Sequence, residues 1–74
     1  MKEQFKPGDL IKATRPGYLH CESTDGVLVE FSRGDVAVFL SVAEYGMFVR
    51  LFIWGRPHLS GEAYAEHYFE KVKS

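Results

Sequence analysis

Three histidines, one cysteine and ten carboxylates are the residues of this 74-residue chain that could perform acid–base, nucleophilic or metal chemistry. His20, Cys21 and Glu22 are consecutive, whereas His58 and His67 lie far along the chain. Zinc ligands usually occur at short spacings such as C-x-x-C or H-x-x-x-H, which this chain lacks. A catalytic thiol needs a base and an orienting group in a pocket, and a domain this small offers little room for one. We therefore expect no catalytic residue, no metal site and no cofactor, and we interpret Cys21 as a small apolar residue at a strand end.

The segment MFVRLFIW, residues 47–54, has the composition of a recognition surface. If it is a strand, Phe48, Arg50, Phe52 and Trp54 share one face and the alternate residues face the core. Aromatic side chains with an arginine are typical of protein interfaces, and they could also stack on nucleic-acid bases. Strong barrel curvature could instead bury both faces, with Arg50 reaching out to water. The sequence leaves these three interpretations open.

The residues beyond this segment extend the candidate surface. GRPHLSG, residues 55–61, is rich in residues that break secondary structure, and we predict a loop that carries recognition residues or simply connects two strands. The predicted binding residues are Phe48, Arg50, Phe52, Trp54, Arg56, His58 and Tyr68.

Charge and composition indicate which class of partner the protein binds and in which cellular compartment it lies. The net charge is −1, and the nine basic residues are interleaved with acidic ones, so nucleic acid is the less favoured partner. A single cysteine excludes an internal disulfide, which is typical of intracellular proteins. The chain has no apolar run long enough to span a membrane, and its start does not resemble a signal peptide. We expect a cytoplasmic protein, in its own cell or in a host, without membrane contact.

The elements that must position these residues are predicted to be strands. Residues 10–14, 27–31, 35–42 and 47–54 are rich in β-branched and aromatic side chains and are separated by Gly and Pro turns. The stretches RPGY, CESTDG and AEYG between them indicate turns or loops. In the last segment, GEAYAEHYFEKV, we predict one helical turn over 64–67 and a fifth strand over 68–72. The whole chain, residues 1–74, is predicted to be one all-β domain.

These motifs resemble a known family. EFSRGDVAVFL, YGMFVRLF and GEAYAEHYFEKV are similar to the second half of SH3 domains, and FKPGDLIKA resembles the first strand of many SH3-like and KOW-type barrels. The resemblance covers most of the chain. It implies a five-stranded SH3-like barrel with one short 3-10 turn before the last strand.

The resemblance does not extend to the peptide groove of SH3 domains. By position, Tyr68 matches the closing tyrosine of that groove, but Met47 and Phe48 stand where the family has its pair of tryptophans, and Ala65 stands where it has a proline. A polyproline ligand depends on an aromatic-lined groove, so this sequence does not favour one.

The function expected from these observations is binding without catalysis. We expect a protein-binding module, such as a small subunit, an adaptor or an inhibitor of a larger protein, of the kind found in cellular complexes, on plasmids or in phages. An exposed edge strand would also make a homodimer plausible. The alternative is a nucleic-acid-binding KOW-type barrel that uses the same aromatic side chains for base stacking.

Overall fold

The fold is a single antiparallel sheet with one short helix. The structure is a computed structural model that describes residues 5–22, 27–42 and 47–72. Its elements are β1 (Leu10–Ala13), β2 (Gly17–Cys21), β3 (Val27–Phe31), β4 (Val36–Val42), β5 (Phe48–Ile53), β6 (Arg56–Gly61), α1 (Glu62–Tyr68) and β7 (Phe69–Lys71). The strands lie in the order β3-β2-β6-β5-β4-β1-β7. The predicted all-β class is therefore confirmed.

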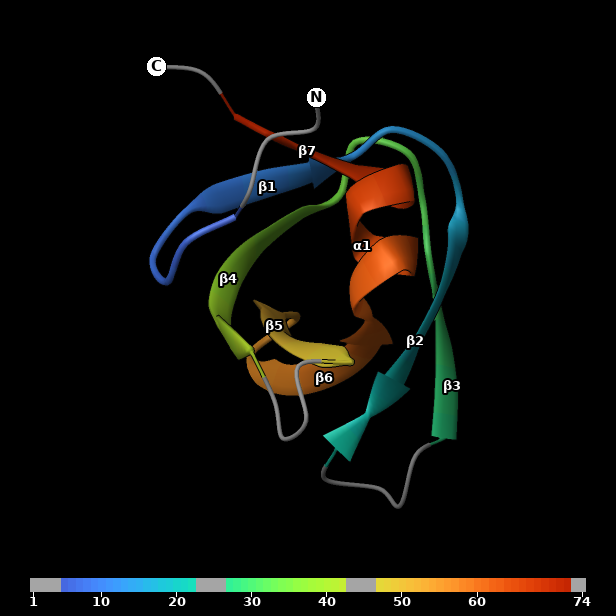
Figure 1. Ribbon diagram of the computed structural model, residues 1–74. Coiled ribbons are helices and arrows are strands. Elements are labelled where there is room, and N and C mark those ends of the chain that lie inside the picture. The colour runs from blue at the N-terminus through green and yellow to red at the C-terminus, as the bar shows by residue number, and fades with distance from the viewer. Residues whose placement is uncertain (1–4, 23–26, 43–46, 73–74) are drawn as a thin grey trace.

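The sheet curls around the helix, as Figure 1 shows. Its concave side carries the apolar residues that alternate with outward ones along each strand, and α1 adds Ala65 to them. At one end of the curl, the ring of Phe31 from β3 lies 4.9 Å from the ring of Phe69 from β7, between their centroids. The buried core consists of Ile11, Ala13, Leu19, Phe31, Ala37, Phe39, Val49, Leu51, Ile53, Ala65 and Phe69.

The number of strands differs from the prediction. All five predicted strands are present, but β2 and β6 come from segments that we predicted to be turns and loops, so the sheet has seven strands in the described residues. The strand order places β3 and β7 at opposite ends of the sheet, which does not confirm a closed barrel. In β2 the inward positions hold Gly17, Leu19 and Cys21, a weakly apolar pattern that the preceding proline obscures.

Pro57 lies inside β6 without breaking the sheet. A two-residue turn joins β5 to β6, so Ile53 and Arg56 are a hydrogen-bonded pair and Phe52 and Pro57 are not. The nitrogen of Pro57 therefore faces away from β5. On that side β2 pairs only with His58 and Leu59, so the missing N–H removes no ladder bond. This is why a segment rich in breakers is still a strand.

The helix is longer than the single 3-10 turn that we predicted. α1 has seven residues, Glu62–Tyr68, and it passes directly into β7. Its Tyr64 hydroxyl accepts a hydrogen bond of 2.9 Å from the backbone N–H of Tyr18 in β2. Burial of Ala65 and this bond to the sheet stabilise a helix that is too short to be stable alone. Within the described residues, no helix is long and apolar enough to cross a membrane.

The contact between α1 and the start of β2 predicts a strict requirement for glycine at position 17. A Cβ atom there would overlap the Tyr64 hydroxyl and lie 2.7 Å from the Phe31 ring. We expect Gly17→Ala to lower the free energy of unfolding by about 1–3 kcal/mol, as overpacked core substitutions do. Chemical denaturation measures this change. Gly61→Ala is the control, since a Cβ atom there would lie at an ordinary 3.8 Å from its nearest neighbour, Cβ of Tyr64. Equal stability of the two variants would contradict the packing.

Candidate functional site

The outward side of β5 carries exposed aromatic side chains. Val49, Leu51 and Ile53 face the concave side and are buried, so the alternate residues face the convex side. Phe48 is 47% exposed and Phe52 is 42% exposed. The curvature of the sheet therefore does not bury both faces of this strand.

The register extends this surface across the sheet. Phe52 lies opposite Val38 of β4 on one side and opposite Pro57 of β6 on the other, and Val38 lies opposite Leu10 of β1. Leu10 is exposed, while Val38 and Pro57 are half-buried. These side chains form an apolar band across four strands. The alternation of valines in residues 36–42 indicated two faces for β4, but only the register shows that one of them continues the face of Phe52.

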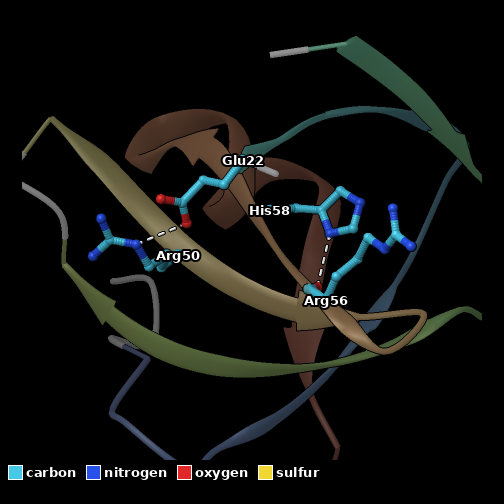
Figure 2. A network of polar contacts seen from close by, with 4 residues as sticks. All are labelled: Glu22, Arg50, Arg56 and His58. Carbon is cyan, nitrogen blue, oxygen red and sulfur yellow. Dashed lines mark hydrogen bonds and ion pairs between the residues drawn. The ribbon is translucent and has the colours of Figure 1, made fainter. Parts of the chain in front are cut away.

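Arg50 lies beside this band and is held in place. Its Nε atom donates a 2.8 Å hydrogen bond to Oε1 of Glu22, just after β2, and the two side chains form an ion pair (Figure 2). Both side chains keep some exposure, so the pair contributes only about 0.2–1 kcal/mol to stability. Its structural effect is to fix the direction of the guanidinium next to Leu59 and Ser41, its register neighbours. No local sequence pattern indicates this long-range pair.

Trp54 does not share the face of Phe48 and Phe52. β5 ends at Ile53, and Trp54 with Gly55 forms the turn to β6, with φ of 54° and 79°. These two positive values are those of a type I′ hairpin turn, which glycine and asparagine favour and tryptophan does not. The Trp54 ring is 47% exposed and meets the His58 ring edge-on, with centroids 5.4 Å apart.

A second surface therefore lies on the concave side of the sheet. It is an open, largely apolar hollow of about 480 Å³, lined by Cys21, Val27, Val29, Trp54, Arg56 and His58. His58 is 1% exposed, and its Nδ1–H donates a 3.0 Å hydrogen bond to the Arg56 carbonyl (Figure 2). The register also sets His58 opposite Cys21, whose side chain is buried. The predicted site residues are thus divided between the convex band and this hollow.

Tyr68 lies apart from both surfaces. It is the last residue of α1, and its ring stacks on the Tyr64 ring at 4.0 Å, with the Arg15 guanidinium 5.3 Å from its centroid. Tyr68 also contacts the Phe31 ring edge-on. These contacts give it a role in packing the helix against the curled sheet.

The described residues include no group of three or more His, Cys, Asp or Glu side chains that could hold a metal ion. His20 is exposed on β2, His58 faces the hollow, and His67 lies on the exposed side of α1, 3.0 Å from Arg15. Cys21 is buried and His20 points to the opposite, exposed side of β2, so these consecutive residues do not form one site.

Comparison with known proteins finds no family model, no curated protein and no solved structure that matches this chain. The resemblance to SH3-like and KOW-type barrels is therefore not confirmed by these comparisons.

The strained turn makes a prediction about Trp54. A residue unsuited to positive φ costs about 1–3 kcal/mol of stability, and asparagine at this position would relieve that strain. The substitution would also remove the contact between the Trp54 and His58 rings, worth about 0.5–1.5 kcal/mol. We expect Trp54→Asn to be neutral or to stabilise the protein by about 1 kcal/mol in thermal or chemical denaturation. Phe52→Asn, in a regular strand, should destabilise it by up to about 1 kcal/mol. A larger loss for Trp54→Asn than for Phe52→Asn would show that the indole ring holds the hairpin together.

Proposed function

We propose that this protein is a non-catalytic protein-binding module whose binding surface is the convex band around Phe48 and Phe52. The observation that carries the proposal is the exposure of Phe52, which lies in line with Leu10, Val38 and Pro57, together with that of Phe48 on the same face of β5. No described helix or strand covers this side of the sheet. A contiguous apolar surface in contact with water is typical of a docking site.

The mechanism would be burial of aromatic anchors beside an oriented arginine. Phe48 and Phe52 would enter pockets of a partner and be removed from water, which is the contribution that dominates protein interfaces. Arg50, held by Glu22, would lie next to them with its direction already set. Because less side-chain freedom is then lost on binding, the contact gains affinity.

The role that fits such a module is that of a small subunit, an adaptor or an inhibitor of a larger protein. A single small domain with one open apolar face has a surface to offer a partner. The described lining of the hollow on the other side includes Cys21 and His58 but no carboxylate that could complete a catalytic set with them. We also propose that the sheet is a variant of the SH3-like barrel. The short helix before the last strand, and the return of β7 to pair with β1, support that relationship.

Binding of nucleic acid is the alternative, and the placement of the cations does not favour it. Arg50 is paired with Glu22, the Lys71 ammonium lies 3.5 Å from Asp9, and Arg15 lies over Tyr68. Phosphate contacts need cations that gather on one face.

The test is affinity capture from nuclease-treated lysates, followed by reconstitution with the purified partner. We expect a partner protein to be retained, and Phe52→Gln to weaken its binding at least tenfold in calorimetry, as loss of an anchor residue does. Affinity should change little with salt concentration. A steep fall with salt, together with binding to an oligonucleotide, would support the nucleic-acid alternative instead.

Trp54→Gln is the matched control. Trp54 has the same 47% exposure as Phe48 but faces the hollow, so its loss should leave the affinity unchanged. Both variants must first show the wild-type unfolding transition. If Trp54→Gln abolishes binding while Phe52→Gln does not, the convex band is not the binding surface.

A further inference from the structure

The two ends of the sheet differ in how well they resist pairing with another strand. β7 has three residues, and two of them, Glu70 and Lys71, are charged, which discourages pairing. β3, at the other end, has five residues, VLVEF, with Glu30 as its one charge and no proline. Its register with β2 is regular throughout, so no bulge twists the edge away. Figure 1 shows β3 at the outer end of the sheet, with β2 beside it.

The direction of the backbone groups of β3 follows from the hairpin at the centre of the sheet. Ile53 and Arg56 flank the two-residue turn and bond to each other, so every second residue of β6 from Arg56 bonds to β5. Leu59 is one of the alternate residues, and it therefore bonds to its partner His20 in β2. The residues of β2 that bond to β3 are then Gly17, Leu19 and Cys21.

An independent contact supports this assignment. The N–H of Tyr18 bonds to the Tyr64 hydroxyl of α1 and not to Glu30, its register partner in β3, as expected if Tyr18 directs its backbone groups away from β3. Since Gly17, Leu19 and Cys21 pair with Phe31, Val29 and Val27, those three residues of β3 direct their backbone groups to β2. Leu28 and Glu30 consequently direct their N–H and C=O groups to the open edge, where no described strand accepts them.

We propose that this edge pairs with the same edge of a second copy of the chain, antiparallel, about a two-fold axis at Val29. The axis places Leu28 opposite Glu30 of the second copy, and Glu30 opposite its Leu28. Both outward residues of each strand are then hydrogen-bonded, which pairing about Leu28 or Glu30 alone would not achieve. An axis at Glu30 would also set two like charges directly opposite each other, which is unfavourable.

The concave side gives a second reason for a strand at this edge. Val27 and Val29 form one wall of the apolar hollow, and Val27 is 57% exposed. A strand added to β3 places its own Val27, Val29 and Phe31 on the same side, which covers that wall. A strand of five residues buries much less surface than the roughly 1,600 Å² of a standard protein interface. We therefore expect a weak dimer, with a dissociation constant in the micromolar range. The convex band around Phe52 is not part of this contact, so the dimer and the proposed function stand or fall independently.

Sedimentation velocity across a wide concentration range tests the dimer. We expect the wild type to pass from monomer to dimer as concentration rises. Glu30→Pro removes an N–H that faces the open edge and that no described strand accepts, so it should fold normally and remain a monomer. Glu30→Ala keeps the N–H and removes the charge, so it should dimerise at least as tightly as the wild type. A wild type that is monomeric throughout, or a Glu30→Pro variant that dimerises like the wild type, would overturn the proposal.

A pair of substitutions at Leu28 tests the register without changing the backbone. Leu28→Lys places a cation opposite Glu30 of the second copy and should tighten the dimer several-fold. Leu28→Glu removes the same apolar side chain but places an anion there and should loosen the dimer several-fold. A shift in the same direction for both variants would overturn the two-fold axis at Val29.

Discussion

The architecture depends on the packing of two phenylalanines from opposite ends of the sheet against a short helix. Phe31 comes from β3 and Phe69 from β7, and the centroids of their rings lie 4.9 Å apart. Both are buried, and Gly17 allows the start of β2 to lie directly against Phe31 and Tyr64. This packing brings together β3 and β7, the two edge strands of the sheet. It also explains how a chain of 74 residues with no internal disulfide encloses a continuous core.

Because the helix packs against part of the concave side, the convex side of the sheet is left in contact with water. That side would ordinarily carry polar residues, yet β5 presents Phe48 and Phe52 there, and the neighbouring strands add Leu10 and Val38. These side chains are not part of the buried core, and an exposed apolar surface of this kind is typical of a binding site. The hollow beside Trp54 is separate from it, because the turn after β5 directs that ring to the other side of the sheet.

Local pattern predicted much of the fold and only part of the site. β3 begins and ends where its run of β-branched and aromatic residues predicts, and β5 differs by one residue at each end from residues 47–54. β6 was missed because its inward residues are His58 and Ser60, polar side chains that find hydrogen bonds only in the folded protein. The division of the predicted site at Trp54 and the pairing of Arg50 with Glu22 are consequences of tertiary structure. The alternation of residues along one strand cannot predict either of these two features.

The central claim is that the sheet wraps the helix and leaves its convex aromatic band open. Relaxation enhancement of side-chain NMR signals by an inert paramagnetic cosolute measures this directly, since the six phenylalanines sample both sides. We expect strong enhancement for Phe48 and Phe52 and weak enhancement for Phe31, Phe39 and Phe69. Equal protection of Phe52 and Phe31 in the monomer would contradict it, because the convex band would then be covered.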